Sequence, residues 1–237
     1  MTARERLIVA LDVARLDEAR ALVDRIGDVV EWFKIGAQLF TAAGPAAVET
    51  IRQRGGRVFL DLKYHDIPAV VGSAVREAGR LGVGLLTVHA AGGTAMLRAA
   101  AEAASAGAGD RPRVLAVTVL TSLDRAVLHR ELQVPVAVEG HVVHLAGLAR
   151  AAGVDGVVAS PREASRLRIA LSRSALVVTP GVRPLGAEAR DQARVATPEA
   201  AVRAGADYLV VGRPITAASD PAAAAAAIVR EIEGAMP

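Results

Sequence analysis

Short apolar runs alternate with longer amphipathic segments along the chain. The runs are dominated by Val, Leu and Ile, which is typical of strands that are buried on both faces of a sheet. The pattern predicts eight strands, at residues 6–11, 32–36, 57–60, 85–90, 113–120, 156–159, 176–179 and 208–211.

The amphipathic segments between these strands have apolar residues at the spacing expected for helices. Gly55-Gly56 and Gly82 follow two of them, at the place where glycine commonly ends a helix. The stretch 123–135 is less regular. Helices are predicted over residues 17–26, 38–54, 69–81, 92–106, 138–152, 161–169 and 221–233.

Strands that alternate with helices imply a parallel sheet. Eight such units in 237 residues predict a closed (β/α)8 TIM barrel rather than an open doubly wound sheet. No Gly-x-Gly-x-x-Gly sequence follows the first strand, which argues against a Rossmann dinucleotide-binding domain. The expected fold class is therefore α/β, with a single barrel domain over residues 1–237.

The composition excludes several kinds of chemistry. The chain has no cysteine, so it can form neither a disulfide framework nor a catalytic thiolate. Its five histidines never occur as His-x-x-x-His, and no metal site is expected. No apolar run reaches transmembrane length, and Asp12 interrupts the first run too early for a secretory signal. A cytoplasmic protein without a membrane partner is the simplest expectation.

The charge pattern gives little support to nucleic-acid binding. The net charge is +3 and the isoelectric point is about 9.9, but the arginines are scattered and no aromatic residues interleave with them. Of the 28 basic residues, only Lys34 and Lys63 are lysines. Arginine stays protonated at ordinary pH, whereas lysine can release a proton. The two lysines therefore indicate positions where the chemistry of an ammonium group is needed. The alternative is that lysine occurs at these two positions by chance.

Polar residues gather at one end of the predicted barrel, where the active sites of such barrels lie. Core packing alone does not place a polar residue at the same end of several independent strands. The residues concerned end or follow the first five strands: Asp12, Lys34, Asp61, Lys63, His89 and Thr121.

The densest cluster of charge is the stretch Asp61-Leu62-Lys63-Tyr64-His65-Asp66-Ile67-Pro68. Side chains alternate along a strand, so Asp61 and Lys63 are predicted to point the same way. Charges on a buried strand are costly unless they are paired or used. A purely structural interpretation is also open, with Asp61 and Lys63 as an ion pair and Asp66 as a helix N-cap before Pro68.

A second candidate site follows the eighth strand, at Gly212-Arg213-Pro214-Ile215-Thr216. Barrels often bind phosphate at the loops after strands seven and eight. Gly212 permits close approach of the backbone, and the amides of Gly212 and Arg213 can donate to an anion. The Arg213 guanidinium would add a charge-assisted contact of roughly 1.5–3 kcal/mol. The alternative is an ordinary turn with a solvated arginine.

The connection after the seventh strand is long for a barrel, running from Pro180 through polar residues to Pro198. Connections beyond roughly 12–15 residues are usually lids, binding loops or disordered segments. We expect a lid from which Arg183 and Gln192 reach a ligand, with a tolerated surface insertion as the alternative.

The motif Asp61-x-Lys63-x-x-Asp66-Ile67-Pro68 resembles the signature of orotidine 5′-phosphate decarboxylases, and the similarity runs almost end to end. A lone Asp-x-Lys-x-x-Asp would be weak, whereas the set of segments in family order is highly specific. The other segments are Val-Ala-Leu-Asp12, Phe-Lys34-Ile-Gly, Val-Thr-Val-Leu-Thr121-Ser, Thr-Pro-Gly-Val-Arg183-Pro, Asp-Gln192 and Tyr-Leu-Val-Val-Gly212-Arg213-Pro-Ile-Thr.

The resemblance implies removal of the C6 carboxylate of orotidine 5′-monophosphate, giving UMP and CO₂ in pyrimidine biosynthesis, without a metal or organic cofactor. It implies that Lys63 is the general acid that protonates C6 and that Asp61 lies near the substrate carboxylate. Lys34, Asp61, Lys63 and Asp66 would form a catalytic charge network, with Asp66 supplied by the partner subunit of a homodimer.

The resemblance also implies the remaining substrate contacts. Asp12 and Lys34 would contact the ribose, Thr121 would help hold the pyrimidine, and Ile67 belongs to the same substrate-binding set. The phosphate would be bound by Arg183, Gln192, Gly212 and Arg213, with Gln192 bridging towards the base. Ser160-Pro161 departs from the Ser-Ala expected after strand six. For His65 and His89, a structural role is at least as plausible as a chemical one.

Two other functions are left open. Sugar-phosphate decarboxylases or aldolases of the same barrel superfamily share Asp-x-Lys-x-x-Asp but use Mg²⁺, held partly by an acidic residue after strand two. Here that region carries Lys34, a cation where a metal would need an anion. A phosphate-binding barrel without catalysis is the second alternative, and the intact Asp61, Lys63 and Asp66 set argues against it.

Overall fold

The computed structural model describes residues 1–106, 111–171, 174–184 and 196–236. Its eight strands are parallel and close into one barrel in sequence order, with β8 paired to β1. The strands are β1 (Leu7–Ala10), β2 (Trp32–Gly36), β3 (Arg57–Tyr64), β4 (Leu85–His89), β5 (Arg113–Val117), β6 (Gly156–Val158), β7 (Leu176–Pro180) and β8 (Tyr208–Val211). The predicted α/β fold, a single (β/α)8 barrel, is confirmed.

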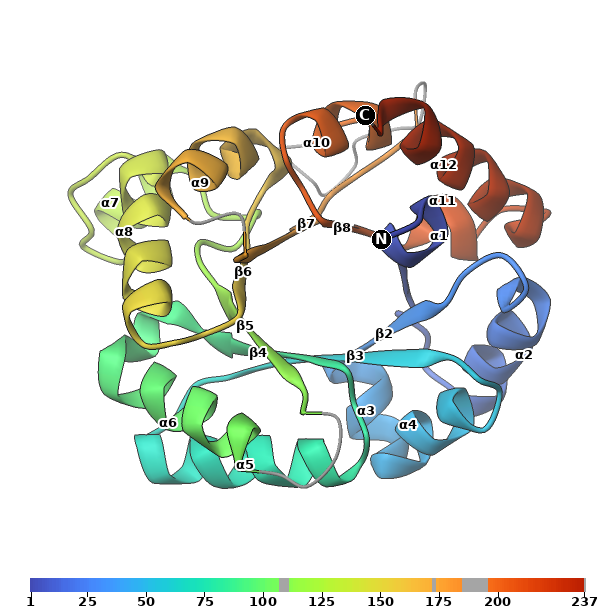
Figure 1. Cartoon of the computed structure of the whole chain (residues 1–237), viewed down its shortest axis with the longest axis horizontal. Coiled ribbons are helices and arrows are strands. Elements are labelled where there is room, and N and C mark those ends of the chain that lie inside the picture. The colour runs from blue at the N-terminus through green and yellow to red at the C-terminus, as the bar shows by residue number, and fades with distance from the viewer. Residues whose placement is uncertain (107–110, 172–173, 185–195, 237) are drawn as a thin grey trace.

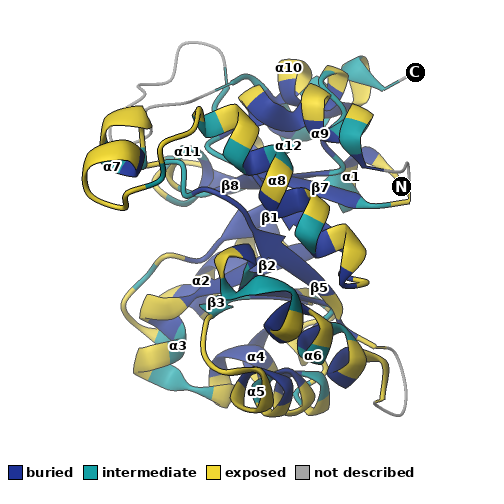
Figure 2. Cartoon of the chain, turned by 90° about the vertical axis from the view of Figure 1, so that its left-hand side faces the viewer, coloured by how far each residue is buried: buried dark blue, intermediate teal, exposed yellow. Residues whose placement is uncertain are grey.

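Helices surround the barrel (Figure 1). Their barrel-facing sides are buried and their outer sides are exposed, so an amphipathic pattern suffices to place them (Figure 2). No helix in the described part of the chain is long and apolar enough to cross a membrane. The helices are α1 (Ala3–Arg6), α2 (Leu16–Ile26), α3 (Ala37–Ala43), α4 (Pro45–Arg52), α5 (Pro68–Arg80), α6 (Gly93–Ser105), α7 (Arg125–Arg130), α8 (Val138–Ala151), α9 (Ala164–Ala170), α10 (Pro198–Arg203), α11 (Arg213–Thr216) and α12 (Pro221–Ala235), with 3₁₀ turns η1 (Ala90–Gly92) and η2 (Pro161–Glu163).

Several element boundaries differ from the sequence prediction, and β3 continues to Tyr64 rather than ending at residue 60. The single helix predicted over 38–54 is wrong, because the chain breaks it at Gly44, whose φ of 57° favours glycine, and Pro45 then starts α4. The fifth strand ends at Val117 rather than at residue 120. The irregular stretch 123–135 contains α7, whose first turn is capped by the Asp124 carboxylate.

Alternate residues of each strand enter two separate cores, as the pleat requires. Val9, Val58 and Val114 belong to the large core between the barrel and its helices. Their neighbours fill the inside of the barrel, in a cluster made of Ile8, Ala10, Trp32, Phe59, Leu85, Leu115, Leu176, Val178, Tyr208 and Val210. Because apolar side chains fill the inside of the barrel, ligands are left to its two ends.

Candidate active site

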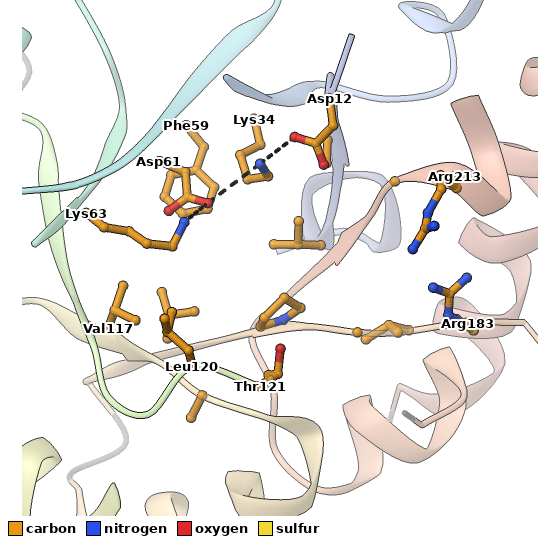
Figure 3. Close-up of a pocket in the computed structure, with 18 of the residues that line it drawn as sticks. Asp12, Lys34, Phe59, Asp61, Lys63, Val117, Leu120, Thr121, Arg183 and Arg213 are labelled. Carbon is orange, nitrogen blue, oxygen red and sulfur yellow. Dashed lines mark hydrogen bonds and ion pairs between the residues drawn. The ribbon is translucent and has the colours of Figure 1, made fainter. Parts of the chain in front are cut away.

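A cavity of about 460 Å³ lies at the C-terminal ends of the strands, where the sequence predicts the site. Residues of β1, β2, β3, β5, β6, β7 and β8 contribute to its wall. Figure 3 shows a cluster of acidic residues and lysines on one side, and Arg183 and Arg213 together on the other. The cavity therefore has two charged ends joined by a largely apolar wall.

Lys34 is the buried centre of the charged cluster. Its Nζ donates to Asp12 Oδ1 at 3.0 Å and lies 3.6 Å from Asp61 Oδ2. The residue is 8% exposed, and a buried ammonium is tolerated only when it is paired in this way. Gly36 leaves room for the pair, because a Cβ there would lie 3.1 Å from Lys34 Nζ and 3.2 Å from Asp12 Oδ1.

Asp61 accepts hydrogen bonds at both oxygens. Lys63 Nζ donates to Oδ2 at 2.8 Å and the Thr87 hydroxyl donates to Oδ1 at 2.9 Å. Burial acts to raise the pKa of Asp61, but the charges of Lys34 and Lys63 and the two hydrogen bonds outweigh burial and hold that pKa below its ordinary value. Asp61 is therefore ionised at neutral pH and presents a fixed negative charge beside Lys63.

Lys63 reaches the cavity through an irregularity in β3. Leu60 pairs with Leu86 and Tyr64 with Val88, so β3 advances four residues where β4 advances two. Within this bulge Lys63 has a φ of 53°, a left-handed conformation that costs on the order of 1–3 kcal/mol for such a residue. Simple strand alternation therefore does not hold at Lys63, although Asp61 and Lys63 both line the cavity as predicted.

Thr87 is a site residue that the sequence analysis did not identify. Its side chain is fully buried on β4, where it donates to Asp61 and accepts a 2.9 Å hydrogen bond from the Lys63 backbone N–H. It thus fixes both the carboxylate and the bulge. Threonine is common in strands, so the run Leu85-Leu86-Thr87-Val88 gave no signal beyond a single hydroxyl in an apolar strand.

The other end of the cavity carries Thr121, Arg183, Gly212 and Arg213, all of which line its wall as predicted. The backbone N–H of Arg183 donates to the Ala196 carbonyl at 3.0 Å, and Val182 and Ala196 form a β-bridge. These contacts join the two ends of the long connection after β7. Gln192 and the rest of the predicted lid, residues 185–195, lie outside the described residues.

Asp66 and Ile67 are not among the residues that line this cavity. Asp66 is exposed, and its Oδ1 accepts a 2.6 Å hydrogen bond from the Ile67 backbone N–H. The N-cap of α5 is Ile67, so the alternative of Asp66 as the N-cap is wrong. Ile67 is 64% exposed and Val70, one helical turn on, is 47% exposed. The chain does not bring Asp66 into its own cavity.

The rings of His65 and His89 lie close together, with centroids 5.4 Å apart. Burial lowers the pKa of His89, the positive charges of His65 and Lys63 lower it further, and Asp61 opposes them. Neither histidine lines the cavity. Among the residues that the structure describes, no group of three or more His, Cys, Asp or Glu is arranged to hold a metal ion.

Comparison with known proteins places this geometry in a family. Residues 5–228 match the family described as Orotidine 5'-phosphate decarboxylase / HUMPS family. The orotidine 5'-phosphate decarboxylase of Moorella thermoacetica is 56% identical over 237 residues, covering 98% of this chain and 94% of the relative. That of Heliobacterium modesticaldum is 54% identical over 236 residues, covering 98% and 97%. The crystal structure of the Lactobacillus acidophilus enzyme of the same name has a TM-score of 0.87 at 39% identity, covering 96% of this chain and 99% of that chain.

Proposed function

Because the chain belongs to the orotidine 5′-phosphate decarboxylase / HUMPS family, we propose that it converts orotidine 5′-monophosphate to UMP and CO₂ in pyrimidine biosynthesis. The observation that carries the proposal is a cavity with a paired Asp61 and Lys63 at one end and two arginines at the other. The substrate has a reacting carboxylate on its base and a phosphate at its far end. The two charged ends of the cavity suit these two groups.

Lys63 is the proposed proton donor. When the bond from C6 to the carboxylate carbon breaks, CO₂ leaves and the electron pair stays on C6. The Lys63 ammonium then gives a proton to C6 and becomes a neutral amine. Asp61 holds the ammonium at 2.8 Å before the substrate reacts, so the positive charge is in place when the carbanion develops.

The charge of Lys63 cannot supply the whole acceleration. Two unit charges about 4 Å apart interact by roughly 4 kcal/mol at an effective dielectric constant near 20. Enzymes typically lower the barrier by about 8–23 kcal/mol. The remainder must come from the preorganised network of Asp12, Lys34 and Asp61 and from binding energy at the distant phosphate, which positions the base.

We assign the phosphate to the end of the cavity that contains Arg183, Gly212 and Arg213, together with Gln192. A Cβ at Gly212 would meet Ala10 Cβ at 3.6 Å and Asp12 Oδ2 at 3.8 Å, which are ordinary contacts. Packing within the chain therefore does not require glycine at this position. We propose that glycine occurs here because it lets a ligand approach the backbone closely. Asp12 and Lys34 would contact the ribose, and Thr121 the pyrimidine.

Substitution of Arg213 by alanine is expected to raise KM about 10–100-fold and to lower kcat by less. A charge-assisted hydrogen bond contributes roughly 1.5–3 kcal/mol, and each 1.4 kcal/mol is a factor of about ten in affinity. Steady-state kinetics measure the effect, and Arg20→Ala on the exposed face of α2 is the matched control. If the Arg213→Ala enzyme saturates at the same substrate concentration as the wild type, Arg213 does not bind the phosphate.

The Thr87→Val variant should lose about 10–100-fold in kcat/KM, because valine keeps the shape of threonine but breaks both of its hydrogen bonds. The pKa of Asp61 should rise in this variant, since one of its stabilising donors is lost. Thr87→Ser keeps the hydroxyl and should restore most of the activity. If folded Thr87→Val retains the wild-type kcat/KM, the hydroxyl does not position the pair.

We also propose a homodimer in which Asp66 and Ile67 complete the partner subunit's site. Asp66 is only three residues from Lys63 in sequence, yet it does not line the cavity of its own chain. The adjoining Ile67 and Val70 are exposed apolar side chains, which suits a surface covered by a second copy. An isologous two-fold contact would exchange the two Asp66 residues between sites.

The reaction is proposed to need no metal or organic cofactor and to take place in the cytoplasm, where a charged nucleotide is retained. Purified protein should form UMP and CO₂ in equal amounts from orotidine 5′-monophosphate. The Mg²⁺-dependent sugar-phosphate alternative predicts no such products and a requirement for the metal. Lys34 argues against this alternative. Its ammonium lies between two carboxylates, at the place where the alternative needs an acidic metal ligand.

A further inference from the structure

A second cavity, of about 800 Å³, opens at the opposite end of the barrel, where the strands begin. The described residues that line it include four arginines and no aspartate or glutamate. We call it the basal arginine cavity. Its arginines come from the end of α4, the start of β3, the segment before β5 and the first residue of β5: Arg52, Arg57, Arg111 and Arg113.

Only part of this positive charge is neutralised. Arg111 makes two hydrogen bonds to the Asp155 carboxylate, at 3.0 and 2.5 Å. Arg52 lies 3.8 Å from Glu49, at the outer limit of an ion pair. Within the described part of the chain, no carboxylate forms an ion pair with Arg57 or Arg113. The cavity thus retains an excess of exposed positive charge.

Glycines clear the space that two of the lining side chains occupy. A Cβ at Gly82, which has a φ of 75°, would lie 2.6 Å from the guanidinium carbon of Arg52. A Cβ at Gly84 would lie 2.7 Å from the Trp32 ring. The turn between α5 and β4 is therefore shaped around a guanidinium and an indole, both of which carry hydrogen-bond donors.

The two remaining polar side chains of the lining, the Trp32 indole and the Tyr208 phenol, each carry a donor. The Trp32 indole N–H is buried and has no hydrogen-bond partner among the described residues, and Arg57 lies 4.3 Å above the ring. Burial raises the pKa of Tyr208, Arg113 and Arg57 act to lower it, and the more weakly acting Asp207 and Glu5 carboxylates act to raise it, so the field of both arginines reaches the phenol. Donors in excess of acceptors are best satisfied by an anion.

We propose that the basal arginine cavity binds a small multivalent anion with a polyphosphate group, held by Arg52, Arg57 and Arg113. Guanidinium forks match phosphate oxygens in pairs, and several forks at one opening suit more than one phosphoryl group. Inorganic tripolyphosphate and the triphosphate of a nucleotide share this chemistry. The site is separate from the proposed active site, and its occupancy does not depend on decarboxylation.

Tripolyphosphate binding, measured by calorimetry at fixed ionic strength, tests the proposal. Arg213→Gln is the starting protein, because it weakens anion binding at the other end of the barrel. One tripolyphosphate should bind per chain, and adding Arg113→Gln should weaken the affinity roughly tenfold, the effect of about 1.4 kcal/mol. Adding Arg20→Gln, a matched exposed arginine on α2, should leave the affinity unchanged.

Absence of binding, or an affinity that Arg113→Gln leaves unchanged, would overturn the proposal. Equal weakening by Arg20→Gln would also overturn it, because non-specific attraction would then explain the binding. Arg52→Gln on the other wall of the cavity gives the same test if Arg113→Gln does not fold. ATP supplies the second arm: equal affinity for ATP and tripolyphosphate supports an inorganic ligand, and tighter binding of ATP supports a nucleotide.

Discussion

Substitution of Lys63 by alanine is expected to lower kcat by about 10⁵-fold or more while substrate affinity changes much less. Loss of a charge about 4 Å from the developing carbanion costs roughly 4 kcal/mol, close to a thousandfold in rate. Loss of a positioned general acid typically removes about another 10²–10⁴-fold. Single-turnover kinetics give the rate, and competition with UMP gives the affinity of the folded variant.

Lys63→Arg is the matched control for charge without proton transfer. The guanidinium keeps the positive charge but does not release its proton at ordinary pH, so this variant should also turn over very slowly. Lys34 and Lys63 are the only lysines in the chain. In protein labelled with ¹⁵N-lysine, substitution of one of them removes one of two side-chain amine signals and so assigns both. Near-normal turnover by Lys63→Ala would rule out Lys63 as the general acid.

A mixture of two inactive variants, Lys63→Ala and Asp66→Asn, is expected to recover about one quarter of the wild-type activity. Asp66→Asn alone should lose about 30–5,000-fold, since removing one partner of a charge pair buried in the dimer interface costs about 2–5 kcal/mol. If Asp66 crosses the interface, a mixed dimer has one intact site and one doubly altered site. Random assortment makes about half of the dimers mixed, and half of their sites intact.

The matched control mixes Lys63→Ala with Asp61→Asn. Both residues line the cavity of their own chain, so a mixed dimer contains no intact site and should stay inactive. Sedimentation would establish the dimer independently. An Asp66→Asn mixture no more active than its two components, once mixed dimers are shown to form, would place Asp66 outside the partner's site.

The position of the site was predictable because barrel topology brings the ends of distant strands together. Asp12, Lys34, Asp61, Lys63 and Thr121 each follow or end an apolar run, and all five line one cavity. The family motif added specificity that strand periodicity alone could not provide.

Other features depended on tertiary contacts that no local pattern reports. At the bulge, the Lys63 backbone N–H donates to the hydroxyl of Thr87 on the neighbouring strand. Thr87 itself looks like an ordinary strand residue. The break at Gly44 was missed because the helical periodicity continues across it, although Gly44-Pro45 was the available signal.

The most direct test of the proposed function is the fall in absorbance as orotidine 5′-monophosphate becomes UMP, recorded in buffer that contains EDTA. We predict rapid conversion by the wild-type protein at the same rate with and without the chelator, and almost none by Lys63→Ala. No conversion by folded wild-type protein would contradict the proposal. Activity that EDTA abolishes would contradict its metal independence and direct the search to sugar-phosphate substrates with Mg²⁺.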